Sequence, residues 1–208
     1  MIIMVLSDRD LRQALKTGKI KITPAPDLEV QLGSCSIDLR LGNTFRIFES
    51  GVHGVIDPQK NAGHEFTKEV TVEEGKAFIM QPGDFALGTT VEKLEVPDDL
   101  LGNLEGRSSI GRLGIIIHST AASIDPGMRG HITLELANMG KLPVALYPDM
   151  RICSISFEQL SSPSEVPYYK KKSPGFILIL LSFPNFATDS ISGVCLCISP
   201  RNALPEIL

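Results

Sequence analysis

The chain has 208 residues, a mass of 22.6 kDa and a formal net charge of −4 at pH 7. A chain of this length suits one domain and can bury enough core to fold without a disulfide or metal staple. The acidic balance argues against a nucleic-acid-binding protein, because phosphate backbones attract a basic surface. A small anionic ligand stays possible, because it needs only a few local cations.

The four cysteines form no CxxC pair and no pattern typical of a disulfide framework. No signal peptide opens the chain, so we expect a cytoplasmic protein with reduced thiols. The longest apolar run, Phe176 to Phe183, is too short to cross a bilayer. No membrane partner is therefore expected.

A short helix is predicted near the N-terminus. Ser7 can cap it, and Asp8 and Asp10 stand in its first turn, where the helix dipole favours negative charge. Gly18 suits the position that ends a helix, because glycine adopts the left-handed conformation easily.

After this helix the pattern changes from a helical period to a period of two, as expected for half-buried strands. Turn signals rich in Gly, Pro and Asp separate the strand candidates. Many short strands with few helices predict a mainly β protein, either a barrel or a sandwich. The candidates are Ser36–Leu41, Thr44–Phe48, Glu69–Val72, Ala77–Met80, Phe85–Thr90, Leu101–Glu105, Gly114–Ile117, His131–Leu136, Pro143–Leu146 and Arg151–Phe157.

The end of the chain has a different composition. Residues 173–208 hold a single basic residue and mix apolar runs with Pro, Ser and Asn. Neither strand nor helix periodicity persists there. We therefore divide the chain into a domain over residues 1–170 and an atypical C-terminal tail over residues 171–208.

The densest polar signal is the segment Glu105–Gly114, which stands between two strand candidates. Its arginines, Arg107 and Arg112, can clamp phosphate oxygens, and Ser108 and Ser109 offer hydroxyl and main-chain donors. It is not a Walker A loop, because no Gly-Lys-Ser/Thr occurs. Phosphate binding and a surface turn with solvated arginines both fit this pattern.

A second signal is Asp125, which stands before Pro-Gly. Turn formation alone explains an aspartate at this position. The functional interpretation is that its carboxylate accepts a hydrogen bond from a sugar hydroxyl.

A third signal is Glu135, in a strand whose other face carries Ile132, Leu134 and Leu136. A carboxylate on a solvated strand face is the plain interpretation. The functional alternative is a general base on a rigid strand. None of the four histidines pairs with another histidine or a cysteine at zinc-ligand spacing, so no transition-metal site is predicted.

These three signals, in this order, resemble the motifs of the dCTP deaminase/dUTPase family. Gly106–Arg112 is similar to the family's phosphate-binding signature, His118–Gly127 to its nucleoside-binding hairpin, and Gly130–Leu136 to the segment that carries the deaminase's glutamate. The resemblance extends over about residues 1–170, supported by three further segments: Met4–Leu11, Ser34–Arg40 and Ser161–Tyr168.

The resemblance implies a distorted β-barrel of the dUTPase-like type, related to the jelly roll, with a short N-terminal helix. It also implies a homotrimer with active sites shared between subunits. The N-terminal helix and Glu135 favour the deaminase branch over plain dUTPases. Met128 occupies the position where dUTPases usually carry a tyrosine.

The resemblance further implies a zinc-independent reaction, in agreement with the missing zinc-deaminase signature. Glu135 would be the general base that activates water, and Ser108 and Arg112 would hold that water and the developing charge. Magnesium would bind through the triphosphate, and dTTP is a candidate feedback inhibitor. The implied substrate-binding residues are Arg107, Ser108, Ser109, Ile110, Gly111 and Arg112 for the phosphates, Tyr168 beside them, Asp125 for the sugar 3′-hydroxyl, and the main chain around Thr133, Leu134 and Glu135 for the base.

The chain departs from the family after Tyr168. Family members usually continue into a basic, glutamine-containing tail that folds over the triphosphate. Here Lys170, Lys171 and Lys172 are followed by Ser-Pro-Gly-Phe-Ile-Leu, without the expected glutamine or Gly-Pro-Thr. We hypothesise that this tail replaces the usual lid, and we expect weaker triphosphate binding and low turnover as a result.

Three functions stay open at this point. The first is a dCTP deaminase that forms dUTP and ammonia for the synthesis of dUTP and dTTP precursors. The second is a bifunctional enzyme that forms dUMP and pyrophosphate. The small Ser123 resembles such members, whereas some dCTP-only deaminases carry a large basic residue there. The third is a nucleotide-binding homologue with impaired catalysis.

Overall fold

The computed structural model describes residues 4–48, 66–118 and 122–171. The tail over residues 173–208 and part of the predicted hairpin motif, Ser119–Ala121, lie outside the described residues. Within the described part of the chain, no helix is long and apolar enough to cross a membrane.

The predicted N-terminal helix is confirmed as α1, Asp8–Thr17. Gly18 ends it in the left-handed conformation, with φ of 72°. Ser7 stands at the N-cap, but its hydroxyl donates to the Asp10 carboxylate at 3.1 Å rather than to a helix amide. Leu11 is fully buried, so one face of the helix packs on the core.

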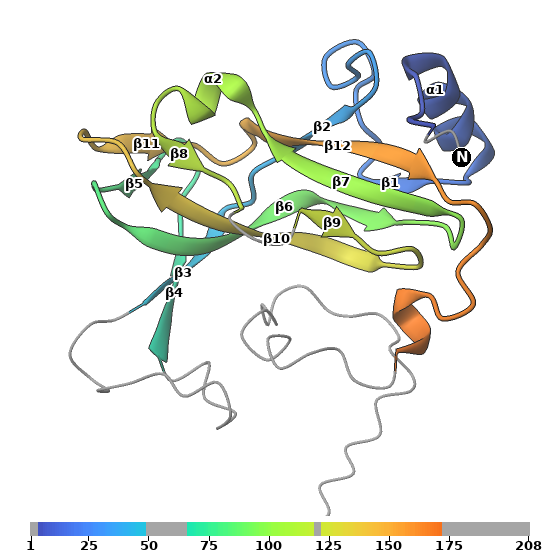
Figure 1. The fold of residues 1–208 in the computed structure, drawn as a ribbon. Helices are drawn as coiled ribbons and strands as arrows, with labels where there is room; N and C mark the ends of the chain where they lie inside the picture. The colour runs from blue at the N-terminus through green and yellow to red at the C-terminus, as the bar shows by residue number, and fades with distance from the viewer. Residues whose placement is uncertain (1–3, 49–65, 119–121, 172–208) are drawn as a thin grey trace, which may run out of the picture.

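Most described strands form two large sheets that face each other (Figure 1). Both sheets are built from antiparallel pairs, and a separate hairpin pairs β5 with β11. The larger sheet has the order β4 (Thr67–Thr71), β3 (Thr44–Phe48), β6 (Phe85–Glu95), β10 (Arg129–Asn138) and β8 (Ile115–Ile116), with β1 (Lys21–Thr23) also paired to β6. The second sheet has the order β2 (Ile37–Arg40), β12 (Arg151–Gln159), β7 (Leu100–Gly106) and β9 (Ser123–Ile124); the hairpin joins β5 (Phe78–Met80) and β11 (Val144–Leu146).

The core lies between the two sheets. Leu134 and Phe45 of the larger sheet and Leu104 and Phe157 of the smaller sheet belong to one buried cluster, each at most 1% exposed. Burial of such side chains supplies roughly 1.5–3 kcal/mol each, so this cluster holds the sheets together. The mainly β class is thus confirmed, and the ladders of the described strands form open sheets rather than a closed ring.

Two strands were not predicted, β1 and β9, because three and two residues are too few to show a period of two. Strand β6 also runs five residues beyond the predicted end at Thr90, through the charged Glu92. Glu92 is fully buried, and its carboxylate accepts from Arg40 Nε at 2.7 Å and Gln31 Nε2 at 3.1 Å. The strand continues inside because these partners satisfy the charge.

Candidate functional site

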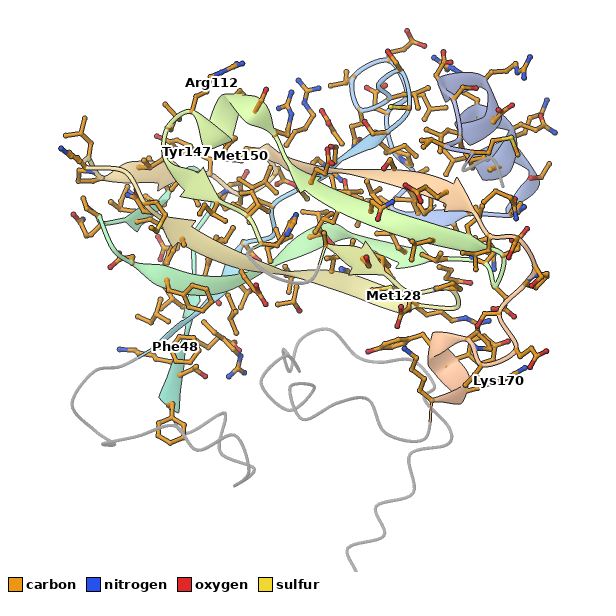
Figure 2. The ribbon with its side chains drawn as sticks, viewed as in Figure 1. Phe48, Arg112, Met128, Tyr147, Met150 and Lys170 are labelled. Atoms are coloured by element: carbon orange, nitrogen blue, oxygen red, sulfur yellow. The ribbon has the colours of Figure 1, made fainter. Side chains whose placement is uncertain are left out.

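The predicted phosphate-binding segment forms a single helical turn, α2 (Ser108–Gly111), directly after β7. Ile110 is 8% exposed and anchors the turn to the core. Its neighbours Ser108, Ser109 and Arg112 are exposed at the surface. Figure 2 shows Arg112 projecting from the top of this turn into solvent. The segment therefore presents hydroxyls and one guanidinium on a fixed backbone.

Hydrogen bonds within the turn decide which main-chain donors stay available. The amides of Ile110 and Gly111 donate to the Arg107 carbonyl at 2.9 and 3.0 Å, and the amide of Arg112 donates to the Ser108 carbonyl at 3.0 Å. The amides of Ser108 and Ser109 have no acceptor among the described residues. These two amides, with their hydroxyls, are the donors that an anion can use.

Arg107 differs from Arg112 because protein groups hold its guanidinium. Its Nε lies 3.3 Å from Asp38 Oδ2, and its Nη1 donates to the Arg151 carbonyl at 3.3 Å. Arg151 Nη1 also contacts Asp38 Oδ2, at 3.1 Å. Asp38 therefore bridges two arginines beside the start of α2.

An open pocket of about 300 Å³ lies beside this segment. Its lining is polar near the turn and apolar along β8. Neither Asp125 nor Glu135 reaches it. The lining residues are Glu105, Gly106, Arg107, Ser108, Gly111, Ile115, Ile116, Ile117 and His118.

Asp125 begins the tight turn that joins β9 to β10. The Met128 amide donates to its carbonyl at 3.1 Å, and Gly127 has φ of 80°, which glycine adopts without strain. The Asp125 carboxylate forms an ion pair with Lys171. Asp125 therefore begins the turn through its main chain, and its carboxylate retains one oxygen, Oδ1, that Lys171 does not contact.

The segment before the tail packs against this turn. Tyr168, in the short helix η2 (Tyr168–Lys170), donates its amide to the Pro126 carbonyl at 2.7 Å. A Cβ on Gly127 would lie 2.6 Å from Pro167 Cβ, so the contact is too close for any larger residue. Tyr169 donates its hydroxyl to Asp98 at 2.9 Å, and this bond raises the Tyr169 pKa. The structure therefore brings Tyr168 and Asp125 together.

Glu135 lies on β10, a strand paired with β6 along most of its length. Its side chain is half-buried, as is that of Thr133, whereas Leu134 between them is fully buried. Leu134 can therefore offer a ligand only its main chain. On its other edge, β10 pairs with β8 only at Ala137 and Asn138 among the described strands.

His131 lies on the same strand. Its Nδ1 lies 3.1 Å from the Thr90 carbonyl. Burial lowers the pKa of His131 below its ordinary value of 6.5, and the nearby Lys93 lowers it further. The hydrogen bond to Thr90 and the charge of Glu92 oppose this shift without reversing it. The ring is therefore a neutral hydrogen-bonding group at pH 7.

The predicted site residues fall into separate groups within one chain. Gly102 pairs with Ile124, so Asp125 comes opposite the start of β7, whereas Ser108 follows the end of that strand. Seven residues at about 3.3 Å each place the two roughly 20 Å apart along the strand. In Figure 2, Arg112 lies at the upper left, whereas Met128 and Lys170 lie toward the lower right. Within one chain, the α2 segment and the Asp125 turn therefore lie toward opposite ends of β7.

Three further polar residues belong to these groups but were not predicted as site residues. Asp38 and Arg151 contact Arg107, and Lys171 contacts Asp125. Asp38 lies within the matched motif Ser34–Arg40, which was the available signal for it. The partners of Arg151 and Lys171 are 113 and 46 residues away in the chain, so local sequence carries no sign of these pairs.

The described residues bring no three His, Cys, Asp or Glu side chains together in a group that could hold a metal ion.

Comparison with known proteins agrees with the motifs. The family model described as dCTP deaminase-like matches residues 5–160. A dCTP deaminase of Thermomicrobium roseum is 59% identical over 170 residues, which cover 81% of this chain and 86% of the relative. A dUMP-forming dCTP deaminase of Dictyoglomus thermophilum is 53% identical over 168 residues, which cover 81% and 87%.

A solved structure has a similar fold. The 2′-deoxycytidine 5′-triphosphate deaminase of Agrobacterium tumefaciens aligns with a TM-score of 0.59 and 22% sequence identity. The alignment covers 76% of this chain and 49% of that one, so this chain spans about half the length of that protein. At this identity the likeness shows the fold alone.

Proposed function

This chain belongs to the dCTP deaminase-like family, and we propose that it hydrolyses dCTP at C4 of cytosine, forming dUTP and releasing ammonia. The observation that carries the proposal is the 59% identity to a dCTP deaminase over 170 residues. The family match over residues 5–160 contains the α2 segment, the Asp125 turn and strand β10. A cytoplasmic location and a place in dUTP supply belong to the same proposal.

Glu135 is the proposed general base. It would take a proton from water as the water oxygen attacks C4, and would then deliver a proton to the departing amine, which leaves as ammonia. Its position on β10, held by β6 along most of the strand, supports this role, because a base on a rigid element keeps its geometry. No zinc takes part in the proposed reaction.

The remaining roles follow from the donors around Glu135 and α2. Ser108 and Arg112 would hold the attacking water and the charge that develops in the transition state. Arg107, Ser109 and Tyr168 would bind the triphosphate, with Ile110 and Gly111 supplying the backbone of the turn. Magnesium would be held by the triphosphate oxygens, since the described residues form no metal cage, and would neutralise part of the phosphate charge.

Recognition of the nucleoside would use Asp125 and the edge of β10. Asp125 would accept a hydrogen bond from the sugar 3′-hydroxyl, and the main chain beside Thr133 and Leu134 would read the base. Feedback inhibition by dTTP at the same site is part of the proposal.

The separation of Asp125 from Ser108 supports a homotrimer with shared active sites. The two residues of one chain lie toward opposite ends of β7, about 20 Å apart along the strand. Each site would then combine the α2 segment of one chain with the Asp125 turn of a neighbour, as closed symmetry allows.

A bifunctional enzyme that forms dUMP and pyrophosphate is the second candidate. Two observations favour it: the small Ser123 before the Ile124–Asp125 pair, and the dUMP-forming relative at 53% identity. Product analysis separates the two candidates, because only the second releases pyrophosphate.

The experiment incubates the full chain with dCTP and magnesium and resolves the nucleotides by chromatography. Glu135→Gln is the test variant, and Glu158→Gln, which alters another strand carboxylate on β12, is the matched control. We expect turnover in the parent and in Glu158→Gln, with kcat lowered at least a hundredfold, about 10²–10⁴, in Glu135→Gln. Full activity of Glu135→Gln would contradict the base assignment. Binding of dCTP by the parent without ammonia release would favour the third candidate, a non-catalytic homologue.

A further inference from the structure

One carboxylate, Asp38, holds two arginines of the smaller sheet. Its Oδ2 contacts Arg107 Nε at 3.3 Å and Arg151 Nη1 at 3.1 Å. The three residues come from β2, the end of β7 and β12, and these strands are neighbours in the order β2-β12-β7. The Asp38 side chain is only 18% exposed, so water and salt screen these contacts less than at the surface.

The network fixes one edge of the Arg107 guanidinium. Nε is held by Asp38 and Nη1 by the Arg151 carbonyl. Arg151 is itself anchored, because its Nη1 also donates to the Val30 carbonyl at 2.5 Å. The remaining nitrogen of Arg107, Nη2, has no acceptor among the described residues, and Arg107 lines the pocket beside Ser108. Asp38 thus leaves one donor nitrogen for a ligand.

Arg107 also connects this network to the backbone of α2. Its carbonyl accepts the amides of Ile110 and Gly111. A shift of Arg107 would therefore shift the turn that carries Ser108 and Ser109. The two free amides and the Arg107 guanidinium depend on the same anchor.

The charge balance of the network favours an anion. Two guanidiniums and one carboxylate give the network itself one net positive charge, and Glu105 also lines the pocket. Without the Asp38 charge, the two guanidiniums would face each other with no anion between them, and their repulsion would drive them apart.

We infer that Asp38 is a positioning residue of the triphosphate site, which acts on the phosphates through Arg107 and the α2 turn and touches no substrate atom itself. This inference rests on the proposed function. It predicts that loss of the Asp38 charge weakens binding of the phosphates and leaves binding of the nucleoside unchanged.

The test measures the dissociation constants of dCTP and of deoxycytidine by calorimetry, in the full chain carrying Glu135→Gln so that turnover does not interfere. Asp38→Asn keeps the side-chain shape and removes the charge. We expect the Kd of dCTP to rise about tenfold or more, the size of one lost charge-assisted hydrogen bond, while the Kd of deoxycytidine changes less than about twofold. In the chain with Glu135 intact, KM should rise, and kcat should fall as well, because the same turn carries Ser108.

Glu69→Gln is the matched control. It removes the charge of another half-buried carboxylate, which pairs with Arg46 at 3.3 Å on β3 and β4 of the other sheet. We expect no change in either dissociation constant. Arg107→Gln provides a double-mutant cycle: if Asp38 acts through Arg107, adding Asp38→Asn to Arg107→Gln should cost little more.

Equal weakening of dCTP and deoxycytidine, unchanged dCTP affinity in Asp38→Asn, or full additivity with Arg107→Gln would each overturn the inference. If thermal unfolding shows that the Asp38→Asn variant is not folded, Arg107→Lys replaces it. That variant keeps the charge but lacks the planar fork, so the same selective loss of dCTP affinity is expected. Failure of the Glu135→Gln chain to bind dCTP would instead refute the proposed function.

Discussion

Asp125 and Ser108 of one chain lie about 20 Å apart, one opposite the start of β7 and the other just beyond its end. Their separation follows from the antiparallel pairing of β7 with β9, in which Gly102 is opposite Ile124. We propose that the Asp125 and Ser108 that bind one nucleotide come from different chains.

Subunit mixing tests this arrangement. Chains with Ser108→Ala and chains with Asp125→Asn are each expected to be nearly inactive. After subunit exchange, random mixing restores both residues to about a quarter of the sites, so activity should reappear. The measurement is dCTP turnover before and after exchange.

A matched control uses two residues of the same segment. Mixing Ser108→Ala chains with Arg112→Gln chains should restore nothing, because both residues belong to the α2 segment of one chain. Recovery in this control, or its absence in the first mixture, would contradict the shared site.

The ion pair between Lys171 and Asp125 predicts competition with the sugar. Lys171 contacts Oδ2 of Asp125, so a 3′-hydroxyl would compete with the lysine at that oxygen. Lys171→Met should therefore tighten binding of deoxycytidine, by no more than about fivefold because exposed ion pairs contribute at most about 1 kcal/mol. Lys170→Met, which alters the neighbouring lysine, is the control and should have no effect. Weaker binding in Lys171→Met would argue that the lysine assists the ligand.

His131 predicts a pH dependence of stability. Burial lowers its pKa from the ordinary 6.5, so the unfolded chain binds a proton more readily than the folded chain. The contribution of His131 to the free energy of unfolding is fully present above pH 6.5. It is lost as the pH falls below 6.5 and through the pKa of the folded state. His131→Gln should flatten the fall in the free energy of unfolding as the pH drops below 6.5. An identical slope in the variant, measured by urea unfolding, would exclude His131 as the cause.

Asp149 predicts a stabilising substitution. Among the described residues it is the one non-glycine with positive φ, at 63°, in the turn between β11 and β12. Its contact with Arg40 Nη1, at 3.4 Å, is long and exposed. Asp149→Gly should therefore raise the free energy of unfolding by up to about 1 kcal/mol, because glycine adopts this conformation without a Cβ clash. Asp149→Ala is the control and should destabilise; thermal unfolding measures both.

The C-terminal tail predicts a gain of function. Residues 171–208 contain no glutamine and no Gly-Pro-Thr, so they lack the pattern that we expect of a lid over the triphosphate. Replacing them with a family-type tail should lower the KM for dCTP and raise turnover, because a closed lid excludes water from the site. A tail of equal length made of Gly and Ser is the control. No gain over that control would refute the lid hypothesis.

The elements that could be predicted from the sequence are those whose signals lie in neighbouring residues. The helix α1 could be predicted from Ser7 and Gly18, and β10 from the alternation of residues 131–136. Helix caps and hydrophobic periodicity both depend on residues that are close together in the sequence. Sequence reasoning failed at β1 and β9, which are too short to show a period, and at the end of β6, where the buried Glu92 looks like a surface residue.

The sequence by itself determined the mainly β class, the N-terminal helix and the three motifs that identify the family, because each depends on residues close together in the chain. Only the tertiary structure decided which of those motifs meet. It joined Asp38 to Arg107 and Arg151 across three strands, and it set Asp125 far from Ser108 within one chain. Strand register and sheet order control these distances, and both arise from pairing between segments remote in sequence, which no local pattern encodes.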